Sequence, residues 1–156
     1  MTAAVLPLGA LYHLGFIARD LDAATAALGA RYGVSRFRRI RRNAWLDVAQ
    51  ARVGEMILEI SQIGPGAPAL YADYEVDPAT GIGLHHYGQR IATTEGWADL
   101  QAAIAAHGLA VPFAGEAMDG DLRFAFVDTR RDIGAYTEYV FWTGSALGMN
   151  DSIPRH

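Results

Sequence analysis

Hydrophobic and polar positions along the first half of the chain follow two different periods. Residues 11–18 alternate with a period of two, as a strand does, and an apolar stripe at helical spacing follows over 21–32. Asp20 or Asp22 is suited to cap the start of this helix, and Gly33 to end it. Further alternation predicts three more strands, over 36–42, 44–49 and 55–61. The first half therefore reads as strand, helix and three strands.

The second half repeats this order of elements. A strand is predicted over 84–91, and Thr93 or Thr94 can cap a helix that ends at Gly108. Three strands follow, near 110–115, 122–127 and 135–142. Matched strings open the two halves, Leu-Tyr-His-Leu-Gly at 11–15 and Leu-His-His-Tyr-Gly at 84–88.

A repeated order of elements predicts a duplicated fold. We expect one domain over 1–156, made of two repeats at about 10–61 and 84–142 and joined by a Pro- and Gly-rich linker over 62–83. The fold class is α+β, with two tandem βαβββ modules forming a cupped mixed sheet whose helices cover the outer face. The segment after Trp142 has little periodicity, which predicts a loose arm or lid.

Composition removes several kinds of chemistry. All thirteen basic residues are Arg and the chain has no Cys, so Schiff-base lysines, thiolate nucleophiles and sulfur-ligated metals are excluded. The net charge of −4 gives no reason to expect binding to nucleic acid or to an anionic membrane. The apolar N-terminal stretch contains Pro7 and His13 and lacks a basic segment, so we expect no signal peptide and a cytoplasmic location.

Two histidines and two glutamates occupy equivalent places in the two halves. Strand alternation directs His13 away from the helix-covered face, and the repeat register makes His86 its equivalent, while His85 points to the opposite side. Glu59 and Glu138 each lie in an apolar closing strand, where a buried carboxylate needs a positive partner. Each residue alone is explained by an ordinary structural role. Together they predict one divalent ion held by nitrogen and oxygen (Mn, Co, Ni, Zn, Fe or Mg), with two coordination positions open for substrate.

At these residues the chain resembles a known superfamily. The run over 13–24, the string Gly-Leu-His-His at 83–86, and Asp128-Thr129, Gly134 and Glu138 are similar to the vicinal oxygen chelate superfamily, which includes glyoxalases, bleomycin-resistance proteins and extradiol dioxygenases. The resemblance covers about 10–142, and the branch near methylmalonyl-CoA epimerase fits best. It implies a small-molecule substrate and a homodimer, with the site formed within one chain or across two.

The resemblance leaves three activities to compare. The first is a metal-dependent isomerase, epimerase or lyase that abstracts an α-proton beside a chelated carbonyl of a small molecule or thioester, with Glu59 and Glu138 as catalytic carboxylates. The second is an Fe(II) extradiol dioxygenase, which the extra ligand Glu59 disfavours. The third is a binding or resistance protein, which a complete ligand set disfavours. Tyr136 shares a strand face with Glu138, where it either contacts substrate or packs against its neighbours.

A cluster of arginines lies at Arg36–Arg42. In a strand its charges fall on both faces, which is typical of a solvated sheet edge. The alternative is an anion site for a carboxylate or for the phosphates of a CoA thioester. The edge interpretation is favoured.

Overall fold

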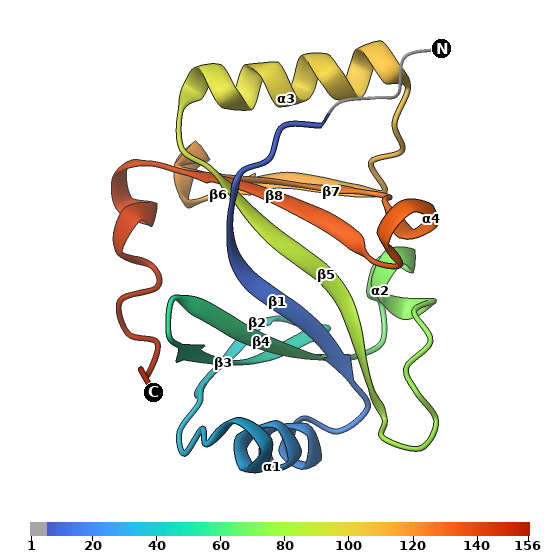
Figure 1. Cartoon of the computed structure of the whole chain (residues 1–156), viewed down its shortest axis with the longest axis vertical. Helices are drawn as coiled ribbons and strands as arrows, with labels where there is room; N and C mark the ends of the chain where they lie inside the picture. The colour runs from blue at the N-terminus through green and yellow to red at the C-terminus, as the bar shows by residue number, and fades with distance from the viewer. Residues whose placement is uncertain (1–5) are drawn as a thin grey trace. The chain divides into compact units, whose positions relative to one another are not determined.

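The structure is a computed structural model that describes residues 6–156. The fold class is α+β, as predicted (Figure 1). The first repeat contains β1 (Ala10–Ala18), α1 (Leu21–Tyr32), β2 (Arg38–Asn43), β3 (Leu46–Val53) and β4 (Met56–Ile63). The short helix α2 (Ala69–Ala72) follows. The second repeat contains β5 (Ile82–Ile91), α3 (Thr94–His107), β6 (Phe113–Ala117), β7 (Leu122–Val127), α4 (Arg130–Ile133) and β8 (Tyr136–Trp142).

The strands form one mixed sheet in the order β2-β3-β4-β1-β5-β8-β7-β6. Strand β1 is parallel to β4, whereas β2, β3 and β4 are antiparallel to one another, as are β6, β7 and β8. The chain divides into two compact units whose boundaries fall inside β1 and β5. The first unit contains Tyr12–His86 and Asn150–His156, and the second contains the described residues before Tyr12 together with Tyr87–Met149.

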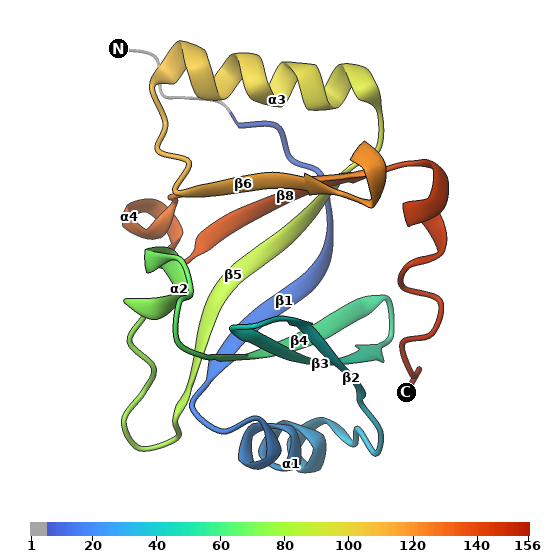
Figure 2. The same ribbon diagram turned by 180° about the vertical axis from the view of Figure 1, so that it is seen from behind.

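Helix α1 begins and ends at the predicted residues. The Asp20 carboxylate accepts a hydrogen bond from the backbone N–H of Ala23 at 2.8 Å, and Gly33 ends the helix with a φ of 71°. The helix lies beside β3 and β4 (Figure 2), where Leu21 and Ala24 join a buried cluster with strand residues. The predicted apolar stripe is wrong at its last member, because Tyr32 is 54% exposed.

Residues of β1, β3 and β4 that face the helix alternate with residues that face away from it. Ala49 and Ile60 pack with α1, and Leu58 packs with Val34 just beyond that helix. The sheet register aligns Gly15 with Glu59, and Glu59 with Gln50. Side chains aligned across neighbouring strands share one face. Positions 15, 50 and 59 therefore lie on the face opposite α1.

The second unit is built on the same plan. Thr93 caps α3 by accepting a hydrogen bond from the backbone N–H of Gly96 at 3.0 Å, and Gly108 ends the helix in the left-handed conformation. The apolar stripe of α3 packs against β7 and β8, in a cluster that contains Trp97, Leu100, Ile104, Val127, Tyr139 and Phe141. Because Tyr139 and Phe141 face the helix, Tyr136 and Glu138 lie on the other face of β8.

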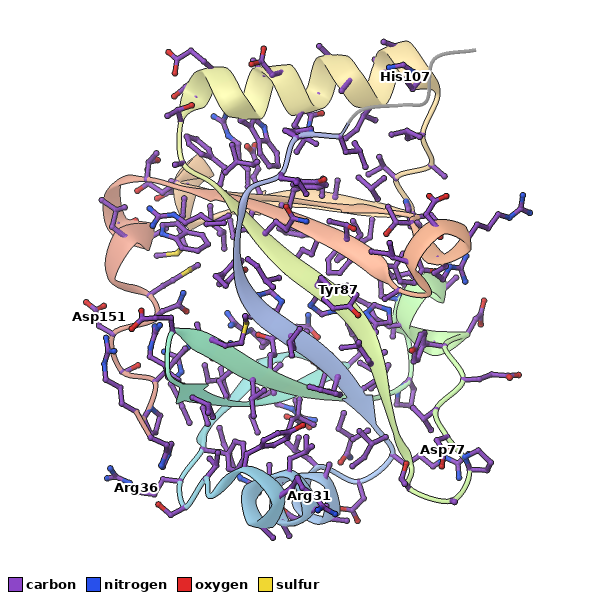
Figure 3. The ribbon with its side chains drawn as sticks, in the orientation of Figure 1. Arg31, Arg36, Asp77, Tyr87, His107 and Asp151 are labelled. Atoms are coloured by element: carbon purple, nitrogen blue, oxygen red, sulfur yellow. The ribbon has the colours of Figure 1, made fainter. Side chains whose placement is uncertain are left out.

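The C-terminal segment is ordered against the first unit, so the prediction of a loose arm is wrong. Ile153 is buried, and backbone hydrogen bonds join Arg52 to Pro154 and to His156 at 2.8 and 2.9 Å. The His156 ring also contacts the Arg36 carbonyl (Figure 3 labels Arg36, and Asp151 in the C-terminal segment). Pairing with a strand end explains this order, although the segment has no hydrophobic period. Among residues 6–156, no helix has both the length and the apolar character needed to cross a membrane.

Candidate metal centre

The structure brings the two predicted histidines together in the first unit. His13 lies on β1 and His86 on β5, next to Tyr87 (Figure 3), and both are at most 3% exposed. Their Nε2 atoms are 2.7 Å apart, and the ring planes are almost perpendicular at 87°. Two imidazole nitrogens bound to one ion at about 2.1 Å and at right angles lie about 3 Å apart. The donor pair therefore fits a shared divalent ion.

Burial keeps His86 in the form that binds a metal. Desolvation lowers the pKa of His86 well below its ordinary value, and the nearby His13 and His85 lower it further. His86 is therefore neutral at neutral pH, and one of its ring nitrogens carries a lone pair instead of a proton.

Gly15 provides the space that the His86 ring occupies. A Cβ placed on Gly15 would lie 1.9 Å from Cε1 of His86 and 2.2 Å from Nε2. These distances are far below van der Waals contact, so any side chain at this position collides with the ring. The glycine in the string Leu-Tyr-His-Leu-Gly is therefore required by the histidine of the other repeat.

Glu59 lies on the same face of the first unit and is hydrogen-bonded there. Gln50 donates from Nε2 to the Glu59 carboxylate at 2.6 Å, and Arg38 donates to the Oε1 atom of Gln50. Arg38 also donates to the hydroxyl of Ser152 at 2.6 Å. The three side chains follow the register across β2, β3 and β4. This polar row compensates the half-buried carboxylate and fixes its position.

Glu138 and Tyr136 belong to the second unit. Glu138 is half-buried on β8 and pairs in register with Phe126, which lies in a cluster of aromatic rings. Tyr136 is 3% exposed, and the guanidinium of Arg130 lies 4.6 Å from the centre of its ring. Asp128 holds this arginine through two hydrogen bonds of 2.9 and 2.7 Å. Glu138 is thus aligned with a buried aromatic residue, and a cation lies over Tyr136 on the same face of β8.

The arginine cluster forms an edge strand, which confirms the favoured interpretation. Strand β2 is the first strand of the sheet, and most of its residues are exposed. Arg39 pairs with Asp22 at 2.6 Å, and Arg41 pairs with Asp47 at 2.9 Å. Exposed pairs of this kind contribute about 0–1 kcal/mol each. Arg38 turns toward the face that carries Glu59.

Three contributors to this region were not predicted from the sequence. The role of Gly15 is steric, and a pattern of polarity carries no steric information. Gln50 lies one residue beyond the strand predicted over 44–49, so it was not paired with Glu59. Strand alternation directs His85 to the side opposite His86, although the two rings are in direct contact. The doubled histidine at 85–86 was the available signal for this last residue.

The fold of the chain is shared with proteins of known structure. Two βαβββ repeats in one mixed sheet match the fold of solved methylmalonyl-CoA epimerases. The resemblance seen in the sequence is therefore confirmed at the level of the fold. No protein-family model matches the chain, and no curated protein matches it in sequence.

Three solved structures with a similar fold cover most of this chain at low sequence identity. Methylmalonyl-CoA epimerase from Streptomyces coelicolor, solved with 2-nitronate-propionyl-CoA, is 21% identical with a TM-score of 0.58, and the match covers 88% of this chain and all of that one. Methylmalonyl-CoA epimerase from Mycobacterium tuberculosis is 16% identical with a TM-score of 0.61, covering 92% of this chain and 94% of that one. A hypothetical protein from Bacillus halodurans is 17% identical with a TM-score of 0.59, covering 87% and 96%.

Proposed function

We propose that the chain is a metal-dependent epimerase or isomerase that moves an α-proton beside the carbonyl group of a small acyl thioester. The observation that carries this proposal is the convergence of the Nε2 atoms of His13 and His86 at 2.7 Å in a buried position. Two imidazoles this close are a nitrogen donor pair that suits several divalent ions. Metal binding and catalysis then also depend on the carboxylates that complete the ligand set with the two histidines.

We propose Glu138 and Glu59 as those carboxylates. His13, His86 and Glu138 each offer one ligand atom to an ion. Glu59 shares a sheet face with Gly15, next to His13 along β1, and its hydrogen bond from Gln50 leaves the other carboxylate oxygen available as a ligand. Hydrogen bonds of this kind orient metal-binding carboxylates in proteins.

The chemistry follows from the residue types. A bound divalent ion would polarise a chelated carbonyl and so make the neighbouring C–H more acidic. The Glu138 carboxylate takes the α-proton as a general base and returns it as the conjugate acid. Glu59 acts as the second acid–base group, on the opposite face of the substrate, when the reaction inverts the configuration of the α-carbon. Tyr136, on the Glu138 side of β8, contacts the substrate.

The substrate class comes from the structural neighbours. One methylmalonyl-CoA epimerase of this fold was solved with methylmalonyl-CoA, and another with 2-nitronate-propionyl-CoA. Both ligands are acyl thioesters with a polar group next to the α-carbon. We therefore propose a 2-substituted acyl thioester as the substrate of this chain.

Solvent proton exchange tests the function directly. In D₂O, the chain loaded with Mn²⁺, Co²⁺ or Zn²⁺ should incorporate deuterium at the α-carbon of methylmalonyl-CoA, as followed by mass spectrometry. The rate should fall to the uncatalysed background when a chelator removes the ion. Exchange that persists in the chelated protein, or metal-loaded protein that exchanges none of a panel of 2-substituted acyl thioesters, contradicts the proposal.

One observation favours a second activity. Because Gln50 and, through it, Arg38 hold the Glu59 carboxylate, a ligand set of His13, His86 and Glu138 without Glu59 is also consistent with the contacts of Glu59. Two histidines and one carboxylate are the ligand set of non-haem Fe(II) oxygenases. Oxygen uptake by the Fe(II)-loaded protein with catechols would establish this activity, and the same sample without uptake would exclude it.

A further inference from the structure

A chain of hydrogen bonds runs through three histidines of the first unit and ends on a backbone carbonyl. The Nε2 atom of His85 is 2.9 Å from the carbonyl oxygen of Leu70. The Nδ1 atom of His85 is 2.9 Å from Nδ1 of His86. The Nε2 atom of His86 then faces Nε2 of His13. Every ring nitrogen of His85 and His86 therefore has a partner.

The direction of these hydrogen bonds, from donor to acceptor, follows from the carbonyl group at the end of the series. A carbonyl oxygen only accepts, so His85 must donate its proton from Nε2 to Leu70. His85 is fully buried, and a charged ring there is costly, so its Nδ1 carries a lone pair and accepts. His86 must then donate from Nδ1, because a neutral imidazole has one N–H. The Nε2 atom of His86 is left with its lone pair, which accepts the hydrogen bond from Nε2 of His13.

His85 is held in place by the linker between the two repeats, where a short helical turn was expected over 69–75 and α2 is found. The ring of Tyr71 stacks on His85 with centroids 4.9 Å apart and planes 18° apart. The ring of Tyr74 meets it edge-on at 4.8 Å, and the Tyr74 hydroxyl donates to the Leu84 carbonyl. Leu70 and Tyr71 belong to α2, and both are buried. This segment therefore fixes both the anchor carbonyl and the ring that uses it.

We propose that His85 is a positioning residue, which holds His86 in the Nδ1–H tautomer with the bare Nε2 atom turned toward the shared ion site. The proposal rests on the metal site described under the proposed function. It adds that the tautomer is set by Leu70 and His85 before any ion arrives. A histidine with the proton on Nε2 would have to rearrange before it could bind a metal through that atom. Partners of this kind contribute about 10–100-fold to metal affinity.

Two substitutions separate this positioning role from a purely structural one. The Oδ1 atom of His85→Asn stands near the place of Nδ1, so this variant keeps the acceptor for His86 and loses the donor to Leu70. The Nε2 atom of His85→Gln stands near the place of the imidazole Nε2, so it keeps the bond to Leu70 and loses the acceptor. Positioning predicts that His85→Asn binds Co²⁺ within a few-fold of wild type and that His85→Gln loses about 10–100-fold.

The opposite order overturns the proposal. If the role of His85 is only to hold α2 in place, His85→Gln should retain Co²⁺ affinity and His85→Asn should lose it. Equal Co²⁺ affinities of the two variants also contradict the positioning role. Thermal unfolding of both variants gives the structural cost separately from the binding cost.

The tautomer is also measurable without any metal. In the metal-free wild-type chain, a long-range ¹H–¹⁵N correlation spectrum should show that His86 is protonated on Nδ1 and unprotonated on Nε2. A proton on Nε2 overturns the proposal, even if neither variant folds. If the wild-type chain binds no divalent ion, the proposed function fails, while the observed tautomer still decides the role of His85.

Discussion

Replacing Gly15 by alanine is expected to remove the divalent ion, with an affinity at least about 100-fold below wild type, or about 2.7 kcal/mol. The added Cβ would lie 1.9 Å from Cε1 of His86, inside the volume of the ring. Gly15 is fixed by its pairing with Glu59 across β1 and β4, so the histidine ring must move. A displaced ring no longer presents Nε2 to the position it shares with His13. Titration with Co²⁺, followed by absorption spectroscopy, measures the loss.

A glycine with room for a Cβ atom provides the control. At Gly64 a Cβ would meet the nearest atom, on Trp45, at 3.5 Å, which is ordinary van der Waals contact. Gly64→Ala should therefore bind Co²⁺ as wild type does. Overpacking at Gly15 should also lower the free energy of unfolding by about 1–3 kcal/mol. Unchanged Co²⁺ affinity in Gly15→Ala would show that His86 does not bind the ion from the position described.

The substitution Glu138→Gln is expected to lower α-proton exchange by about 10²–10⁴-fold, the usual contribution of a general base. Glutamine keeps the length of the side chain and an oxygen donor, but its amide does not accept a proton at neutral pH. The half-buried place of Glu138 beside Phe126 favours a similar packing of both side chains. The assay is deuterium incorporation into methylmalonyl-CoA by the metal-loaded protein.

Glu116→Gln is the matched control for this experiment. Glu116 is exposed on β6 in the same unit, where its nearest cation is Arg123 at 3.8 Å. Its replacement should leave exchange and metal binding unchanged. If Glu138→Gln exchanges protons at the wild-type rate with its ion in place, the base is another group and the mechanism proposed for Glu138 is wrong.

The elements of the fold were predictable because their signals are local. Asp20 and Gly33 bound α1, and Thr93 and Gly108 bound α3, as the capping chemistry of these residue types predicts. Strand alternation separated the face that carries Glu59 from the face that packs on the helix. These features depend on neighbours within a few residues, which a sequence displays directly.

The features that shape the histidine pair were not predictable in the same way. Gly15 and His86 are 71 positions apart in the chain, and only the paired strands show that one makes room for the other. His85 depends on a backbone carbonyl of Leu70, in a segment with no hydrophobic period. The C-terminal residues are ordered by backbone pairing with Arg52, which leaves no trace in side-chain pattern. Such contacts require the folded chain.

The central claim is that His13 and His86 hold a divalent ion, and the metal content of the purified chain tests it most directly. The wild-type chain should be supplemented with Mn²⁺, Co²⁺ or Zn²⁺, freed of excess ion and analysed by elemental mass spectrometry beside folded His86→Ala. The account predicts about one ion per wild-type chain and none per variant chain. A wild-type chain that retains no ion, or a His86→Ala chain that retains as much, contradicts it.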